Sequence, residues 1–148
     1  MKLEQLYLYS NRIRRLENLD ELTKLRILWL SDNKVSLVEN LSALTSLLEL
    51  NLARNNIRHV GETLISNSKL RSVNLADNPI SSFREISYLG LLRNLNELCF
   101  ADPDWGICPL TTLCNYQTFA LFAIPSLRKL DTIQLDREIP EHATRIYA

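Results

Sequence analysis

The sequence predicts an α/β solenoid, a right-handed stack of short coils. We expect a parallel concave sheet of about five to six short strands, a convex side of short helices and 3-10 turns, and a helical cap at the C-terminal end. Three observations support this prediction. Leucines and one asparagine recur at near-constant spacing, and the apolar residues between these repeated patterns are spaced by three. The pattern breaks over residues 99–110. Since one coil cannot bury its own leucines, successive coils must stack into a common core.

Four units share the pattern LxxLxLxxNxI, with one leucine replaced by valine. They begin at Leu3, Leu25, Leu47 and Leu70, at spacings of 22, 22 and 23 residues. A degenerate fifth unit begins at Leu95, and a truncated sixth at Leu127. Each LxL core alternates between the two faces, as a short strand does when one face is buried. We expect the inward side chains to be Leu6, Leu8, Leu28, Leu30, Leu50, Leu52, Val73 and Leu75.

An asparagine follows each of these four strands. The asparagines are Asn11, Asn33, Asn55 and Asn78. A buried turn leaves backbone donors and acceptors unpaired, which is costly. An asparagine side chain supplies both an acceptor and donors, so a column of asparagines satisfies neighbouring turns. The pattern predicts a structural asparagine ladder.

The second half of each unit predicts the convex side. Residues 14–24 (RRLENLDELTK) space Leu16, Leu19 and Leu22 by three, which favours short helices or 3-10 turns. The complete pattern resembles the leucine-rich repeat family. Its 22-residue units with an IxxLxxL tail resemble the subclass typified by the regulatory subunit of protein phosphatase 1. The resemblance implies a solenoid curved toward its sheet, which acts by binding other proteins.

The two ends of the repeat array differ. Residues 115–131 (NYQTFALFAIPSLRKLD) resemble the C-terminal cap of this subclass, and we expect one helix from about Leu110 to Phe122, stopped by Pro125. The N-terminal end has no equivalent cap, so either the chain is a piece of a longer protein, which we favour, or a partner covers this edge. Residues 1–148 are expected to form one domain, with the cap at residues 109–135 and the tail at residues 136–148, where a helix begins near Pro140.

Residues 99–110 (CFADPDWGICPL) break the pattern. Pro103 stands where asparagine is expected, so we predict that the ladder ends at Asn78 and that a wider turn follows. Trp105 either packs on the previous turn or makes a secondary contact with a partner, and we favour packing. Cys108 and Cys114 are interpreted as small apolar fillers.

Composition argues against several functions. The 17 basic and 17 acidic residues cancel, which disfavours direct binding of nucleic acid or of an anionic membrane. Neither a long apolar run nor a signal-peptide pattern is present, and the three cysteines lack CxxC spacing, so we expect a reduced, cytoplasmic protein. His59 and His142 pair with no nucleophile, and no metal-ligand set or Gly-rich loop occurs. We therefore expect no enzyme activity, cofactor, metal or small-molecule substrate.

The concave face carries the candidate binding residues. They are Tyr7, Tyr9, Arg26, Ile27, Trp29, Glu49, Asn51, Arg54, Arg71 and Asn74. Exposed aromatics beside an arginine are typical of protein-interface hot spots, although Tyr7 and Trp29 are also suited to covering a missing neighbouring repeat. Small residues in the later column, Ala53 and Ala76 among them, leave room for a partner element.

The sequence therefore predicts a non-catalytic module that binds another protein on its concave sheet face. Residues 100–132 resemble a large, cilium-associated multi-repeat member of the family, which implies a ciliary or cytoskeletal location within the cytoplasm. Two alternatives stay open: a regulatory subunit of an enzyme such as a protein phosphatase, and a ribonucleoprotein subunit.

Overall fold

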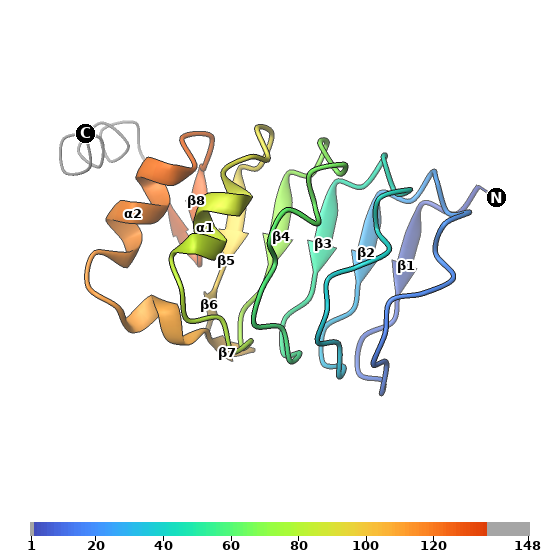
Figure 1. Ribbon diagram of the computed structural model, residues 1–148, viewed down its shortest axis with the longest axis horizontal. Helices are drawn as coiled ribbons and strands as arrows, with labels where there is room; N and C mark the ends of the chain where they lie inside the picture. Colours follow the sequence, from blue (N-terminus) through green and yellow to red (C-terminus); the bar gives the residue numbers. More distant parts are fainter. Residues whose placement is uncertain (1, 136–148) are drawn as a thin grey trace.

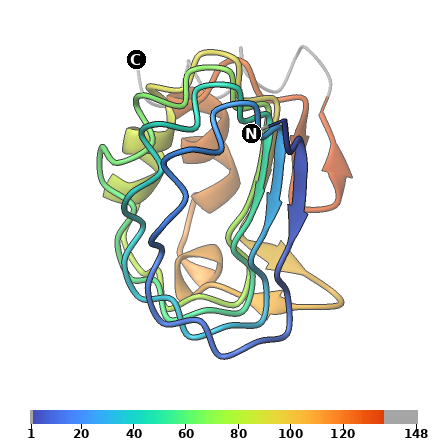
Figure 2. The same ribbon diagram turned by 90° about the vertical axis from the view of Figure 1, so that its right-hand side faces the viewer.

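A mostly parallel sheet of seven strands runs the length of the computed structural model, which describes residues 2–135. The five three-residue strands are β1 (Gln5–Tyr7), β2 (Ile27–Trp29), β3 (Glu49–Asn51), β4 (Ser72–Asn74) and β5 (Glu97–Cys99). They pair in parallel in chain order, and β8 (Lys129–Leu130) pairs in parallel with β5. Figures 1 and 2 show the strands side by side along the stack, with the coils almost superimposed. The predicted solenoid is confirmed.

One strand of the sheet was not predicted. Strand β9 (Ile133–Gln134) runs antiparallel to β8 and forms the last strand of the seven-stranded sheet. The chain turns back directly after Asp131, whose φ of 58° lies in the left-handed region. An antiparallel strand needs only such a tight turn, whereas another parallel strand would need a further crossover.

The register of the sheet aligns equivalent positions of successive units. Leu28 lies opposite Leu50, which in turn lies opposite Val73. These three side chains are at most 1% exposed, so the expected inward face is the core face. Leu6 and Leu8, in the first coil, are only partly buried because β1 pairs with a strand on one side alone.

Asn33, Asn55 and Asn78 tie their coils to the ones before them, whereas Asn11, in the first coil, is exposed and donates to the Leu8 and Tyr9 carbonyl oxygens of its own coil. Asn33 Oδ1 accepts a hydrogen bond from the Ile13 N–H, and Asn33 Nδ2 donates to the Leu8 carbonyl oxygen, both at 3.0 Å. Asn55 and Asn78 make the equivalent bonds one and two coils further along. Each buried asparagine thus satisfies backbone groups in two coils at once.

A second set of asparagines links the coils on the side away from the sheet. Asn40 Nδ2 donates to the Leu16 carbonyl at 2.7 Å, Asn67 Nδ2 to that of Leu41 at 2.9 Å, and Asn94 Nδ2 to that of Ser68 at 2.8 Å. This second set was not predicted, because these asparagines do not share one position in the repeat.

The convex side contains mostly isolated turns. In the first coil the Leu22 N–H donates to the Leu19 carbonyl and the Leu25 N–H to the Leu22 carbonyl, each at 3.0 Å. These are bonds of the 3-10 type, and they do not propagate because each segment is short. Within residues 2–83 no segment becomes a helix, and α1 (Arg84–Leu89) in the fourth coil is the first. The convex side therefore combines the expected 3-10 type turns in the earlier coils with the expected short helix in the fourth coil.

The prediction of one capping helix from Leu110 to Phe122 is wrong. The segment forms a 3-10 helix, η1 (Pro109–Thr112), and a separate helix, α2 (Tyr116–Ala123). Asn115 between them adopts a left-handed φ of 63°, which interrupts the helical path. The expected stop at Pro125 agrees with the structure, since the preceding Ile124 has left the helical region (φ −128°, ψ 80°).

Aromatic contacts hold the cap on the last coils. Phe119 of α2 stacks on Phe83 with ring centroids 4.9 Å apart, and Tyr116 meets Phe100 edge-on at 6.2 Å. None of the helices within residues 2–135 is long and apolar enough to span a membrane. The expected tail helix near Pro140 lies outside the described residues.

Candidate protein interface on the concave sheet

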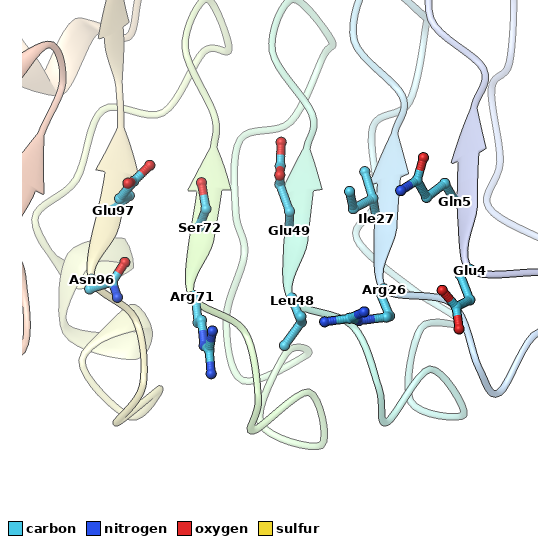
Figure 3. Close-up of a pocket in the computed structure, with 10 residues that line it drawn as sticks. All are labelled: Glu4, Gln5, Arg26, Ile27, Leu48, Glu49, Arg71, Ser72, Asn96 and Glu97. Atoms are coloured by element: carbon cyan, nitrogen blue, oxygen red, sulfur yellow. The ribbon is translucent and has the colours of Figure 1, made fainter.

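The sheet face turned away from the core carries a shallow groove of about 510 Å³ across β1 to β5. Figure 3 displays its lining as two parallel rows of side chains. The row on the strands is Gln5, Ile27, Glu49, Ser72 and Glu97, and the row just before the strands is Glu4, Arg26, Leu48, Arg71 and Asn96. Stacking brings together in this way residues that lie 22 to 25 positions apart in the chain.

An aromatic cluster, formed by Tyr7, Tyr9 and Trp29, lies at the N-terminal end of this face. The rings of Tyr7 and Trp29 are perpendicular with centroids 5.1 Å apart, and Tyr9 lies 6.4 Å from Trp29. Tyr7 is 46% and Tyr9 51% exposed. Trp29 Nε1 donates to Glu49 Oε1 at 2.8 Å, and the Tyr7 hydroxyl donates to Gln5 Oε1 at 3.0 Å. These bonds orient two of the three rings while leaving apolar surface exposed.

Asn51 and Asn74 follow in the column that begins with Tyr7 and Trp29. Their Oδ1 atoms accept hydrogen bonds from the backbone N–H groups of Ala53 and Ala76, at 3.0 Å each, which shapes the exits of β3 and β4. Their Nδ2 groups donate no hydrogen bond within residues 2–135. They are half-buried polar positions in the middle of the face.

The space above the small residues is filled by the chain itself. Strands β6 (Ala101–Asp102) and β7 (Gly106–Ile107) form an antiparallel hairpin that projects on the sheet side of the coils (Figure 2). Trp105 of this hairpin packs against Ala53, Ala76 and Cys99. The expectation that the small residues Ala53 and Ala76 leave room for a partner element is therefore wrong where the Trp105 indole covers them.

Arg54 holds the hairpin in place. Its guanidinium carbon lies 5.3 Å from the centroid of the Trp105 ring, and its Nη2 donates to the Trp105 carbonyl oxygen at 3.2 Å. Its Nε also lies 3.3 Å from Asp77 Oδ2. Arg54, one of the candidate binding residues, thus has an intramolecular role that the sequence did not reveal.

Cys108 extends the asparagine ladder beyond Asn78. Its side chain is fully buried, and its Sγ donates to the Leu75 carbonyl oxygen at 3.0 Å. Asn78 makes the equivalent bond to Leu52, one coil earlier, so the thiol takes the place that Pro103 leaves unfilled. Burial raises the pKa of the Cys108 thiol to about 11, which favours the protonated, hydrogen-bond-donating form.

Asp131 closes the C-terminal end of the core. One carboxylate oxygen accepts hydrogen bonds from the backbone N–H groups of Phe100 and Ala101, at 2.8 and 3.1 Å, and from the Tyr116 hydroxyl at 3.2 Å. Burial raises the pKa of Asp131 above its usual value and outweighs these hydrogen bonds, which lower it.

The titratable groups elsewhere are dispersed. His59 Nδ1 lies 3.9 Å from Glu85 Oε2, and the buried Glu85 accepts hydrogen bonds from the backbone N–H groups of Val60 and Gly61. No group of three histidine, cysteine or acidic side chains in residues 2–135 is arranged to hold a metal ion. His142 lies outside these residues.

Comparison with known proteins gives matches along most of the chain. Residues 2–43 match a family model described as leucine rich repeats in two copies, and residues 43–61 and 66–82 match one described as a leucine rich repeat. A chain of the Drosophila melanogaster SNF/U2A' complex superimposes with a TM-score of 0.86 at 26% identity, over 97% of this chain and 80% of that one.

Two internalins of Listeria monocytogenes also match. The inlF structure has a TM-score of 0.69 at 24% identity, over 90% of this chain and 36% of that one. The inlC2 structure has a TM-score of 0.62 at 27% identity, over 88% of this chain and 52% of that one. The chain therefore spans about a third and about half of these two proteins.

Proposed function

The chain belongs to the leucine-rich repeat proteins, and on that premise we propose that it is a non-catalytic module that binds another protein on its concave sheet face. Leucine-rich repeat folds generally mediate protein–protein interactions through an extended concave surface. The 22-residue units support placing the chain in the subclass typified by the regulatory subunit of protein phosphatase 1. The similar SNF/U2A' structure, a complex, supports a role that depends on a partner.

The single observation that carries the proposal is the aromatic cluster of Tyr7, Tyr9 and Trp29. Tyrosine and tryptophan dominate binding hot spots because they bury a large area with few rotatable bonds. The edge-on packing of Tyr7 against Trp29 and the bond from Trp29 to Glu49 already fix these side chains in the free chain. Binding therefore orders few additional side chains, which lowers its entropic cost.

We infer the path of the partner from the groove next to the cluster. It crosses five strands, from Gln5 to Glu97, on the side where the strands begin. The hairpin with Trp105 occupies the side where β3 to β5 end. We therefore place the partner along the starts of the strands, with its apolar residues on the aromatic cluster.

A quantitative pull-down tests the proposal. We expect Tyr7→Ala combined with Trp29→Ala to reduce partner capture at least about tenfold, since truncating each hot-spot residue costs about 2 kcal/mol of binding free energy. Leu37→Ala combined with Ile65→Ala is the matched control, because these apolar side chains, 61% and 49% exposed, lie on coil segments away from the sheet. Circular dichroism verifies the fold of both variants.

Site-specific crosslinking supplies a second readout that does not depend on stability. A photo-crosslinking amino acid at Tyr9 should attach to the partner, whereas the same amino acid at Leu37 should not. Unchanged capture by the concave variant, or loss of capture by the control variant alone, would show that the concave face is not the interface.

The cellular location and the finer role belong to the same proposal. The resemblance of residues 100–132 to leucine-rich repeat-containing protein 9, a large multi-repeat protein associated with cilia, supports a cytoplasmic protein of the cilium or cytoskeleton. An enzyme-regulatory subunit and a ribonucleoprotein subunit are special cases of a protein-binding module. We place plain protein binding first, because it requires only the interface described above.

A further inference from the structure

A second hollow, of about 340 Å³, adjoins the groove at the starts of β2 to β4. Lys24 and Arg26 line it just before β2, and Lys69 and Arg71 just before β4. These four side chains are called the basic hollow below. The same residue types recur because the sequence KLR directly precedes both β2 and β4, whereas SLL precedes β3.

The basic hollow concentrates charge on a chain whose formal net charge is zero. Its lining holds four cations and one carboxylate, Glu4, so its formal charge is 4 − 1 = +3. None of the four cations lies within 4 Å of a carboxylate in the described part of the chain. All four are exposed, and an anionic ligand would relieve their mutual repulsion.

The spacing of the cations defines what fits. Adjacent strands lie about 4.8 Å apart, so the backbones of Arg26 and Arg71, two strands apart, are separated by about 10 Å along the stack. Figure 3 shows Leu48 between them in the same row. A complementary ligand carries two anionic groups about 10 Å apart with an apolar group between them. Residues i and i+7 of a helix have this separation, since seven residues rise about 10.5 Å.

We propose that the basic hollow binds an acidic segment of the partner protein, with one carboxylate at Lys24 and Arg26, another at Lys69 and Arg71, and an apolar side chain on Leu48. This inference rests on the proposed function and adds the chemistry and the orientation of the partner. Arginine suits this contact because its guanidinium pairs with a carboxylate through two parallel hydrogen bonds.

The neighbouring row explains why we choose an acidic protein segment over a nucleic acid. Glu49 and Glu97 line the groove beside Arg26 and Arg71 (Figure 3). A phosphate backbone is charged along its whole length and would be repelled by these carboxylates. A protein segment can place its acidic residues on the basic hollow only and neutral or basic residues over Glu49 and Glu97.

Titration with a defined probe tests the inference. The probe is a labelled alanine-based helical peptide with Glu at positions i and i+7 and Leu at position i+4. Its binding is measured from the amide chemical shifts of the full chain. We expect Lys24→Glu combined with Lys69→Glu to weaken its binding at least about tenfold. Lys34→Glu combined with Arg58→Glu changes the net charge equally at exposed positions outside the basic hollow and should weaken it less than about twofold.

Three results would overturn the inference. They are equal weakening in both variants, equal binding of a peptide with Gln in place of Glu, and tighter binding of an oligouridylate RNA than of the peptide. The partner-capture assay separates the two proposals. Capture that survives Lys24→Glu with Lys69→Glu but not Tyr7→Ala with Trp29→Ala refutes the basic hollow alone, and the reverse pattern refutes the aromatic interface alone.

Discussion

Asp131 substitutes a side-chain oxygen for the backbone carbonyl that earlier coils receive from the next strand. The Leu30 N–H donates to the Asn51 carbonyl and the Leu52 N–H to the Asn74 carbonyl, both at 2.8 Å. At the last full coil, the Phe100 N–H donates at 2.8 Å to Asp131 Oδ1 instead. A buried amide that would otherwise lack an acceptor is satisfied in this way.

The raised pKa of Asp131 makes stability depend on pH. Burial raises this pKa, so between the usual carboxyl pKa and the raised value the folded chain binds more protons than the unfolded chain. The free energy of unfolding therefore falls as pH rises through this window. Asp131→Asn keeps an oxygen acceptor for Phe100 and Ala101 but does not titrate. We expect its stability relative to the wild type to increase with pH across the window, as measured by urea unfolding.

Asp20→Asn is the control for this pH series, because Asp20 is exposed and its side chain makes no contact with the cap. Its stability relative to the wild type should not follow the same course. If the difference in free energy of unfolding between Asp131→Asn and the wild type stays constant from pH 4 to pH 8, Asp131 is not the source of the pH dependence.

Individual ladder positions were predictable only where the repeat is regular. Asn33, Asn55 and Asn78 follow a strand at fixed spacing, so their role follows from the pattern. Cys108 reaches the same column only because a hairpin returns the chain past Pro103. The length of this hairpin depends on tertiary packing, which local sequence does not encode.

The elements that close the stack depend on one close approach between helices. Gly90 follows α1, and a Cβ on it would collide with the backbone carbonyl oxygen of Ala123 at the end of α2. Backbone cannot move aside as a side chain can, so the two helices would have to separate. The absence of a side chain at Gly90 is what allows α2 to dock.

Gly90→Ala should therefore loosen the cap. We expect the free energy of unfolding to fall by about 2–3 kcal/mol, in the range of overpacking substitutions. Gly61→Ala is the matched control: Gly61 has a left-handed φ of 59° and nothing within 4 Å of its Cβ position, so only a backbone cost of about 1–2 kcal/mol applies. Hydrogen exchange should show lost protection of α2 in Gly90→Ala alone, and equal loss in both variants would contradict this account.

Among the secondary-structure elements, strands were more predictable than helices. Strands β1 to β5 follow from a two-residue alternation that the repeat supplies several times. The division of the cap at Asn115 depends on one left-handed residue, for which the sequence offers no repeated signal. The hairpin was foreseen as a wider turn, but the site of Trp105 on Ala53 and Ala76 involves coils far apart in the chain.

Stability over the whole molecule should follow the position of a coil in the stack. Leu50 is fully buried between coils on both sides, whereas Leu6 is partly buried and has a neighbouring strand on one side. We expect Leu50→Ala to lower the free energy of unfolding by about 3–5 kcal/mol, and Leu6→Ala by about half as much or less. Urea unfolding of this chain measures both, and equal costs would contradict a stack stabilised mainly between neighbours.

The candidate site was partly visible in the sequence. Tyr7, Tyr9 and Trp29 were assigned to the concave face from the repeat alone. Arg26 and Arg71 of the basic hollow were also among the predicted binding residues, but the hollow itself was not recognised, because composition averages its charge against acidic residues elsewhere. Only stacking brings Lys24 and Lys69 to one place.

Trp105 has a consequence for how the molecule unfolds. In a simple solenoid each coil contacts only its neighbours, so the ends can fray without disturbing the middle. Trp105, from the fifth coil, packs against the cluster of Ala53, Ala76 and Cys99, and Arg54 of the third coil contacts both its ring and its carbonyl oxygen. Opening the fifth coil must therefore break contacts with the third, and we expect the third, fourth and fifth coils to unfold together.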